Sequence, residues 1–241
     1  MKSFSHAIVV GGSSGIGAEL VRQLARGGAK VAAIARRRDR LESLKSELGS
    51  NVLIYEHDVT HYDEVPALFQ QVTKELGGLD LIIYAAGVMP QVGPEEFDFE
   101  KDRQMIEVNV LGMIAWLNQA AVRFSNTRSG SIVGIGSLAG ERGRCAQPVY
   151  NTSKAAVATY MEALRNRLAR FGVAIVTIKP GPTATEMTAH MHSRMMDPAA
   201  VAMKVLEKAD QTGEHYVKFV HKVMFAVVRN VPSFIFRRTN I

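Results

Sequence analysis

The sequence is poor in cysteine and in aromatic side chains. Cys145 is the one cysteine among 241 residues, which excludes an internal disulfide and a thiolate metal cluster and fits a reducing, cytoplasmic compartment. Phe, Tyr and Trp make up 7% of the chain and do not alternate with basic residues along a stripe. Despite a net charge of +6, the composition therefore argues against nucleic-acid binding.

The chain also lacks long apolar runs. The N-terminal run 7–10 is short, and the run 223–228 is far below the ~20 residues of a membrane-spanning helix. We therefore expect neither a signal peptide nor a transmembrane segment. No internal repeat, proline- or serine-rich linker or shift of composition divides the chain, so a single domain over residues 1–241 is predicted.

Short β-branched runs alternate with longer segments of helical periodicity. Nearly all-apolar strands separated by helices of this kind are typical of a parallel sheet covered on both faces. The sequence thus predicts an α/β domain with a doubly wound parallel sheet of the Rossmann type. Gly27, Gly49, Gly77 and Gly172 stand where four of the helices should end. The predicted strands are 6–10, 30–35, 52–56, 81–85, 131–135 and 174–179, and the predicted helices are 15–26, 39–48, 63–76, 99–124 and 149–171.

A glycine-rich turn follows the first predicted strand and opens the first predicted helix. Glycines let the backbone approach a pyrophosphate, and the helix N-terminus offers free NH groups and a partial positive charge. Ordinary tight turns can also carry glycines, so the strand-turn-helix setting gives this pattern its weight. The candidate phosphate-binding residues are Gly11, Ser13, Ser14, Gly15, Ile16 and Gly17.

Basic residues stand about twenty positions further on, where an acidic side chain would hold the ribose hydroxyls of NAD. The chain reads Ala35-Arg36-Arg37-Arg38 there, and arginine is the residue that accommodates a 2′-phosphate. We therefore expect NADP(H) rather than NAD(H), with Arg36 and Arg37 as ligands. The alternatives are that these arginines form only the solvated start of a helix, or that Asp39 competes for the ribose.

Tyr150 and Lys154 are four residues apart in a predicted helix, so both side chains should project from one face. A phenol has a pKa near ~10, and a unit charge about 4 Å away at an effective dielectric of ~20 supplies about 4 kcal/mol before desolvation. This energy corresponds to roughly 3 pKa units, enough to bring the pKa of the phenol close to neutral pH. Taken alone, the pair is also compatible with chance, and Lys154 with a solvated helix lysine.

Together these motifs resemble the short-chain dehydrogenase/reductase family, in its compact single-domain branch, over residues 6–187. Asn109, Ser137, Tyr150 and Lys154 are similar to the family's catalytic tetrad. In the alternative interpretation, Asn109 is only a mid-helix polar residue and Ser137 only a turn residue at a strand end. The further cofactor-binding residues that the resemblance implies are Asp58, Val59, Ala85, Ala86, Gly87, Asn109, Tyr150, Lys154, Pro180, Gly181, Thr183 and Thr185.

The resemblance also implies a role for each residue of the tetrad. Ser137 would hydrogen-bond the substrate oxygen, Tyr150 would transfer the proton, Lys154 would lower the tyrosine pKa and hold the nicotinamide ribose, and Asn109 would anchor a water. Prepositioned donors favour the transition state, since the carbonyl oxygen gains negative charge as hydride arrives. The implied activity interconverts a carbonyl and an alcohol on a largely apolar small molecule, in a homodimer or homotetramer. The alternative is a non-catalytic NADP(H)-binding sensor that acts through a protein partner.

Two residues depart from the family pattern. Val10 stands where a threonine is usual, and Tyr84 stands where an asparagine opens the segment after the fourth strand. The family uses both positions mainly to brace the central strands. Their chemical effect should therefore be smaller than their effect on local rigidity.

Substrate choice is assigned by resemblance to stretches 88–94, 138–145 and 182–196. The substrate-loop region, about 182–197, is rich in methionine, which is typical of a mobile lid over an apolar substrate or of a plain amphipathic helix. His190 and His192 complete no ligand pattern, so no metal is expected.

The C-terminal extension, about 219–241, mixes apolar residues with Lys222 and Arg229. It could cover the substrate pocket, join a subunit interface or lie on a membrane surface. Burial in a pocket or an interface is the favoured interpretation.

Overall fold

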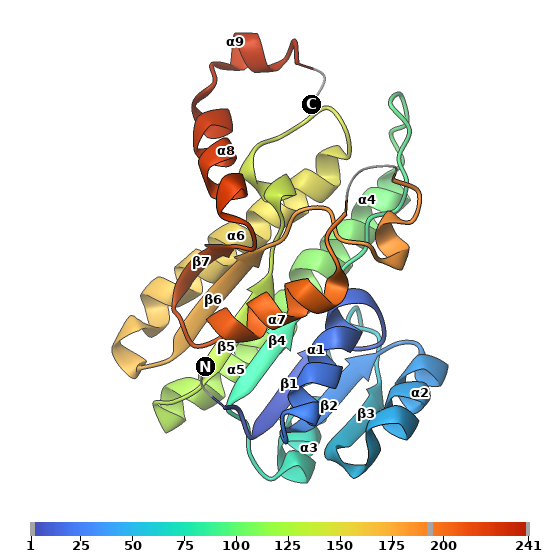
Figure 1. Cartoon of the computed structure of the whole chain (residues 1–241), viewed down its shortest axis with the longest axis vertical. Helices are drawn as coiled ribbons and strands as arrows, with labels where there is room; N and C mark the ends of the chain where they lie inside the picture. Colours follow the sequence, from blue (N-terminus) through green and yellow to red (C-terminus); the bar gives the residue numbers. More distant parts are fainter. Residues whose placement is uncertain (1–2, 192–194, 240–241) are drawn as a thin grey trace.

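Seven parallel strands form one sheet in the computed structural model, which describes residues 3–191 and 195–239 (Figure 1). The strand order is β3-β2-β1-β4-β5-β6-β7, so the chain winds outward from β1 first in one direction and then in the other. The predicted doubly wound, Rossmann-type sheet is confirmed. The strands are β1 His6–Val10, β2 Lys30–Ala35, β3 Val52–Glu56, β4 Leu81–Tyr84, β5 Ser131–Ile135, β6 Ala174–Lys179 and β7 Gly213–Tyr216.

The sequence missed β7. Its residues, Gly-Glu-His-Tyr, are half-buried at the edge of the sheet and pair only with β6. An edge strand has one neighbour and a solvated side, so it needs no apolar run and leaves little signal in the sequence. The other six strands match their predicted bounds except that β4 ends one residue early, at Tyr84.

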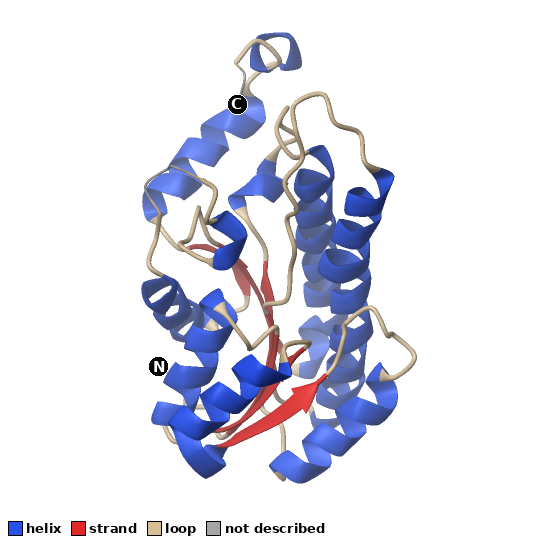
Figure 2. Cartoon of the chain, turned by 90° about the vertical axis from the view of Figure 1, so that its right-hand side faces the viewer, coloured by secondary structure: helices blue, strands red, loops and turns tan. Residues whose placement is uncertain are grey.

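Helices cover both faces of the sheet, as Figure 2 shows in a nearly edge-on view. Alternate residues of β1 divide between the two faces: Ala7 and Val9 pack with α1, α2 and α7, whereas Ile8 and Val10 pack with α3, α5 and α6. Because both faces are buried, the central strands have to be apolar throughout. The helices are α1 Gly15–Arg26, α2 Arg38–Leu48, α3 Val65–Leu76, α4 Phe99–Ile106, α5 Gly112–Thr127, α6 Pro148–Leu168, α7 Pro198–Lys208, α8 Phe219–Asn230 and α9 Ser233–Phe236.

Glycine ends three helical segments as predicted. Gly49, Gly77 and Gly172 follow α2, α3 and the short 3₁₀ turn after α6, each with a positive φ that favours glycine. At the end of α1, Gly27 has an ordinary φ of −77°, and Gly28 takes the left-handed conformation instead.

The segment Phe99–Thr127 is one continuous helix made of α4, a π-helical turn at Glu107–Leu111 and α5. By length and composition alone it could cross a membrane. In this fold Trp116, Leu117 and Phe124 are fully buried against the sheet. Those core contacts account for its apolar composition.

A buried ionic cluster ties the start of the C-terminal extension to the sheet. The Lys179 ammonium lies 2.9 Å from a Glu141 carboxylate oxygen and 2.8 Å from Glu214, and the Tyr216 hydroxyl donates to Glu141 at 2.9 Å. Arg229 of α8 also pairs with Glu141. The Glu141 side chain is 0% exposed, so its charge depends on these partners.

We expect Glu141→Gln to lower the free energy of unfolding by about 3 kcal/mol at neutral pH, because it leaves the buried Lys179 with one carboxylate fewer. Burial acts to raise the pKa of Glu141, but Lys179, Tyr216 and Arg229 outweigh it and hold the pKa below 4.5. A carboxyl with a lowered folded-state pKa stabilises the protein above its unfolded-state pKa and loses that effect as pH falls through the folded value.

Denaturant melts of wild type and variant over a pH series measure this difference. The difference in unfolding free energy between wild type and Glu141→Gln should have its full size above pH 4.5 and become smaller below that pH. Glu214→Gln, at the more exposed partner of Lys179, is the control with a smaller loss. A difference that stays constant down to acid pH would assign the effect to packing rather than charge.

Candidate active site

The glycine turn lies directly against the segment that follows β4. The Gly11 amide donates to the Ile34 carbonyl at 2.7 Å, and Gly11 has a φ of +87°. A Cβ atom on Gly11 would lie 2.4 Å from the Ala86 amide nitrogen, and one on Gly17 would lie 2.0 Å from the Gly11 carbonyl oxygen. No side chain fits at either position, so the turn stays tight and its backbone open for close approach.

The N-terminus of α1 is left without a side-chain cap. Ser14 is the N-cap residue, yet its hydroxyl makes no capping hydrogen bond and instead accepts one from Arg37 at 2.6 Å. Arg37 also reaches the Ser13 hydroxyl at 3.5 Å and Glu186 at 2.5 Å. A guanidinium beside an uncapped helix N-terminus is a cradle for phosphate groups.

Arg36 and Arg37 do not share one environment. Arg36 lies 3.5 Å from Asp58, while Arg37 faces the glycine turn. Burial acts to raise the pKa of Asp58, but hydrogen bonds from Thr60 and the charge of Arg36 lower it below its ordinary value. The Val59 side chain is packed into the core, so of these two predicted residues Asp58 is the one whose side chain faces Arg36.

Asn109 is fully buried on the π-helical turn between α4 and α5. Its side chain closes a ring with Val88, accepting from the Val88 amide at 2.8 Å and donating to the Val88 carbonyl at 3.0 Å. It also donates to the Ser153 hydroxyl of α6 at 3.0 Å. Asn109 thereby joins the loop after β4 to α6, and π-helical turns are frequent at functional sites.

Tyr84 replaces the usual asparagine with a different brace. Its buried hydroxyl donates to the Val108 carbonyl at 2.6 Å, one residue before Asn109. A Cβ atom on Gly112 would lie 2.6 Å from that hydroxyl, so Gly112 makes the room that the larger side chain needs. Tyr84 therefore ties β4 to the π-helical turn that carries Asn109, in place of the usual asparagine.

Ser137, Tyr150 and Lys154 meet at the carboxyl end of β5. A hydrogen bond joins the Ser137 and Tyr150 side chains. The Lys154 ammonium lies 5.8 Å from the Tyr150 ring centroid and donates to the Ile135 carbonyl at 3.1 Å. A Cβ atom on Gly140 would lie 2.6 Å from the Lys154 carbonyl, so glycine there lets the loop after Ser137 close onto α6.

Burial sets the proton affinities of this group. It raises the pKa of Tyr150, against a hydrogen bond from Ser137 and the charge of Arg144, and it lowers the pKa of Lys154 to about 8. The sequence predicts a lowered tyrosine pKa, and the structure gives the opposite direction. Desolvation raises the pKa of Tyr150 more than the Ser137 hydrogen bond and the charge of Arg144 lower it, because an ionised phenolate is poorly solvated here.

Arg144 is a site residue that the sequence missed. It lies on the loop before α6 and donates to the Asn151 side chain at 3.2 Å, and its charge opposes the rise that burial causes in the pKa of Tyr150. Arg144 stands six residues before Tyr150 outside any helix, so no periodicity in the sequence relates the two side chains.

The segment after β6 returns to the glycine turn. The Pro180 carbonyl accepts from the Leu138 amide at 3.2 Å, and the Thr183 hydroxyl donates to the Gly181 carbonyl at 2.9 Å. A Cβ atom on Gly15 would lie 2.9 Å from the Thr185 side chain. The predicted nicotinamide-side loop therefore packs on the predicted phosphate end.

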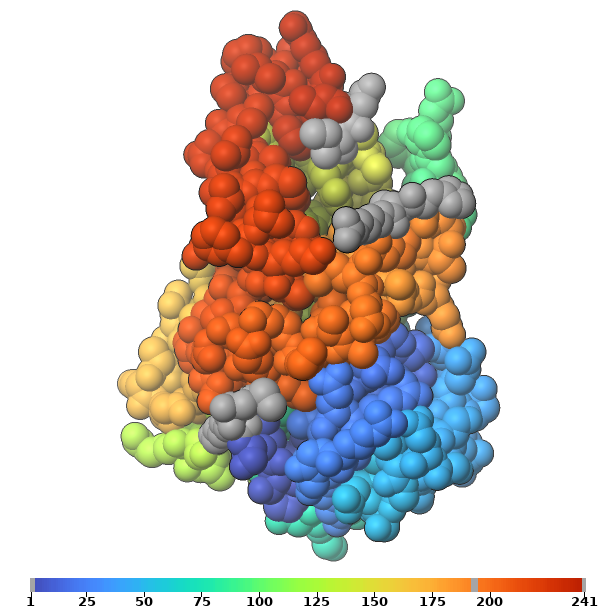
Figure 3. Space-filling model, in the orientation of Figure 1, coloured from blue at the N-terminus to red at the C-terminus, as the bar shows by residue number. Residues whose placement is uncertain are grey.

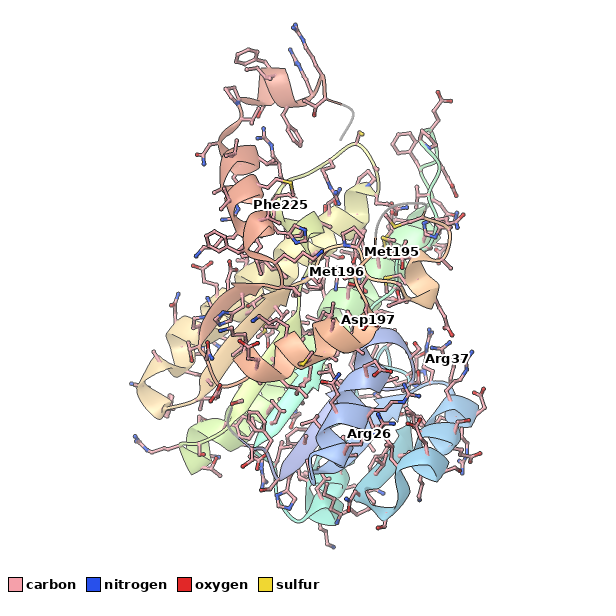
Figure 4. All side chains as sticks on the ribbon, in the orientation of Figure 1. Arg26, Arg37, Met195, Met196, Asp197 and Phe225 are labelled. Atoms are coloured by element: carbon pink, nitrogen blue, oxygen red, sulfur yellow. The ribbon has the colours of Figure 1, made fainter. Side chains whose placement is uncertain are left out.

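A cavity of 640 Å³ lies between the start of α1 and the segment after β6. Its lining includes Ser14, Gly15 and Ala18 on one side and residues from the stretch 184–191, Met195 and Pro198 on the other. Ser137, Tyr150 and Lys154 are not among its lining residues, so the cavity belongs to the phosphate end and not to the reacting end. Met195 and Met196 lie close by, above α7, and Arg37 lies at the start of α2 (Figure 4). These two methionines belong to the last part of the predicted substrate-loop region, about 182–197.

Metal ligation finds no support within residues 3–191 and 195–239, where no group of three His, Cys, Asp or Glu side chains could hold an ion. His192 lies outside the described residues. His190 is described and exposed.

A dinucleotide fits this arrangement. The glycine turn leaves no space for Cβ atoms, α1 presents an uncapped N-terminus, and a Cβ atom on Gly87 would lie 3.4 Å from the Asn109 side chain and 3.7 Å from the Lys154 ammonium. Gly87 thus lies between the glycine turn, which Ala86 contacts, and the predicted catalytic residues Asn109 and Lys154.

A family model described as short chain dehydrogenase matches residues 5–195. The chain belongs to the short-chain dehydrogenase family. An uncharacterized oxidoreductase of Myxococcus xanthus (strain DK1622) is 37% identical over 234 residues, covering 96% of this chain and 91% of the relative. Like that relative, this short-chain dehydrogenase is an oxidoreductase.

Solved structures of the family share the fold. A short chain dehydrogenase from Burkholderia cenocepacia J2315, solved in complex with NADP, has a TM-score of 0.86 at 24% identity and covers 99% of this chain and 98% of its own. A protein described as a short chain dehydrogenase/reductase family protein has a TM-score of 0.80 at 28% identity and covers 88% and 94%.

Proposed function

We propose that this short-chain dehydrogenase is NADP(H)-dependent and interconverts a carbonyl and an alcohol on a largely apolar small molecule. The observation that carries the proposal is the meeting of Ser137, Tyr150 and Lys154 at one end of the sheet, with Gly87 leading from them to the glycine turn. Tyr150 is the proposed general acid in reduction and the general base in oxidation.

When bound, the nicotinamide supplies or accepts the hydride. The Ser137 hydroxyl would donate to the carbonyl oxygen and hold it beside the phenol. Because burial raises its pKa, Tyr150 stays protonated at neutral pH and can donate as negative charge develops on that oxygen. Lys154, with a pKa of about 8, would hold the ribose and take part in restoring the phenol proton.

Two features support NADP(H) over NAD(H). Arg37 is anchored to Ser14 and Ser13 at the phosphate turn, where no acidic side chain from the end of β2 competes. Two structures of this fold, from Burkholderia cenocepacia and of the protein ElxO, were solved with NADP bound. Glu186 occupies one side of Arg37, and the 2′-phosphate would replace that carboxylate as its partner.

The preference for an apolar substrate is supported by the methionines of the substrate-loop region. The terminal carbon of Met187 is 3.9 Å from the position of a Cβ atom on Gly87, so a thioether lies beside the segment that also contacts Asn109 and Lys154. We also place the protein in the cytoplasm, on its cysteine usage. A homodimer or homotetramer would cover exposed apolar side chains of Phe99–Thr127 such as Leu111 and Val122.

The purified protein should oxidise NADPH in the presence of ketones or aldehydes graded by size and polarity, with kcat/KM rising toward the apolar members. Loss of absorbance of the reduced cofactor measures the rate. If the protein binds NADPH tightly but neither reduces any carbonyl of the series nor oxidises the corresponding alcohols, it would instead be the non-catalytic sensor.

A further inference from the structure

Helix α8 carries its apolar side chains on the side that faces away from the protein. Val220, Val223, Met224 and Val227 recur at the i, i+3, i+4, i+7 spacing of one helix face, and all are exposed, at 63, 51, 45 and 63%. The opposite side holds Phe225, the one buried residue of the helix (Figure 4). A surface helix of a globular protein normally has the reverse arrangement.

The next helix, α9, also exposes apolar side chains. Phe234 and Ile235 of α9 are 58 and 46% exposed. In Figure 3, α8 and α9 form the upper end of the molecule. We call these six side chains, Val220, Val223, Met224, Val227, Phe234 and Ile235, the C-terminal apolar face.

Almost all of the net charge of the chain lies in the segment that carries this face. The chain holds 29 Lys and Arg against 23 Asp and Glu, while residues 217–241 hold 5 Lys and Arg and no Asp or Glu. The rest of the chain is therefore nearly balanced, at 24 against 23. An exposed apolar stripe on a segment whose charged side chains are all basic is complementary to a surface that is apolar inside and negatively charged outside.

The face is held rigidly beside the catalytic loops. The Arg142 guanidinium, on the loop after Ser137, donates to the Val231 carbonyl at 2.6 Å and stacks 4.0 Å from the Phe236 ring centroid. A Cβ atom on Gly181 would lie 2.7 Å from the His221 ring. With the Arg229 to Glu141 pair, these contacts fix α8 with its apolar side outward, so that side cannot cover the substrate pocket.

From this geometry we propose that the C-terminal apolar face docks on an anionic lipid bilayer. With its 12 residues, α8 is too short to span one, so it would lie in the plane of the interface. A second copy of the chain fits less well, because a two-fold interface would set one basic surface against an identical one. Docking would place the loops around Tyr150 next to the membrane, where apolar substrates concentrate.

Vesicle co-sedimentation of the full-length protein tests the proposal without needing cofactor or substrate. Wild type should bind vesicles of phosphatidylcholine and phosphatidylglycerol, bind pure phosphatidylcholine much less, and be released by salt. Val227→Glu should lower the partition coefficient at least about tenfold, because it removes an apolar contact and adds a repelled charge. Lys218→Gln with Lys222→Gln should lower it roughly 25-fold, at about fivefold for each basic side chain.

The matched control is Met203→Glu on α7, where the side chain is 59% exposed and lies outside the face. It should bind as wild type does. The double lysine variant gives an independent measurement if Val227→Glu melts at a lower temperature than the control.

Three results would overturn the proposal. The first is no binding of wild type to anionic vesicles, and the second is equal binding by the Val227 and Met203 variants. The third is a wild-type dimer that Val227→Glu separates into monomers without any vesicle binding, which would identify a second copy of the chain as the occupant.

Discussion

Tyr150→Phe is expected to lower kcat for NADPH-linked carbonyl reduction by about a thousandfold, within the range that a positioned acid contributes. The substitution removes the hydroxyl that shares a hydrogen bond with Ser137 and leaves the ring that packs beside Lys154. Cofactor binding should therefore change little. Steady-state kinetics on the best carbonyl of a graded series, with NADPH fluorescence titration for affinity, separates the two effects.

Tyr160→Phe is the matched control for this experiment. Tyr160 stands on the same helix, α6, and its hydroxyl donates to Asn118 at 3.0 Å, away from the catalytic side chains. Its loss should leave kcat unchanged. If Tyr150→Phe kept wild-type turnover, another group would have to be the acid, and the proposed role of Tyr150 would be wrong.

Arg37→Asp is expected to reduce the preference for NADPH over NADH, as the ratio of kcat/KM values, by about 100-fold. Charge-assisted hydrogen bonds contribute roughly 1.5–3 kcal/mol each, and the new carboxylate would also repel a 2′-phosphate. We expect kcat/KM to fall with NADPH and not with NADH, because the ribose hydroxyls of NADH can donate hydrogen bonds to an aspartate. Initial rates with both cofactors at varied concentrations give the ratio.

Neighbouring arginines provide the comparison. Arg38→Asp should leave the ratio unchanged, because Arg38 pairs with Glu42 and Glu56 on the side of α2. Arg36→Asp should have an intermediate effect, since Arg36 stands beside Asp58. An unaltered ratio in the Arg37 variant, with equal use of both cofactors by wild type, would remove the NADP(H) assignment.

The loop after Ser137 links catalysis to the C-terminal extension. Glu141 and Arg142 follow Ser137 within five residues, one pairing with Arg229 and the other holding the Val231 carbonyl. A membrane that binds the C-terminal apolar face would therefore act on a segment joined directly to Ser137, the proposed partner of the substrate oxygen. The rate at which the wild type reduces an apolar carbonyl should change when anionic vesicles are added, whereas the rate of Val227→Glu should not change.

Local sequence determined most of the sheet and the residue types of the site. Strands such as β1 and β6 are buried on both faces, so their apolar runs predicted their bounds, and the glycines of the first turn follow from a backbone that admits no Cβ. Tyr150 and Lys154 share a helix, so their proximity follows from spacing alone.

Tertiary structure decided what depends on partners distant in the sequence. The direction of the Tyr150 pKa, the Tyr84 brace that requires Gly112, and the outward apolar side of α8 all result from burial by residues elsewhere in the chain. Desolvation and exposure are properties of a folded environment, and a linear pattern of residue types does not contain them. The sequence thus specified the chemistry available to this protein, and the packing of its loops and C-terminal helices specified where that chemistry faces.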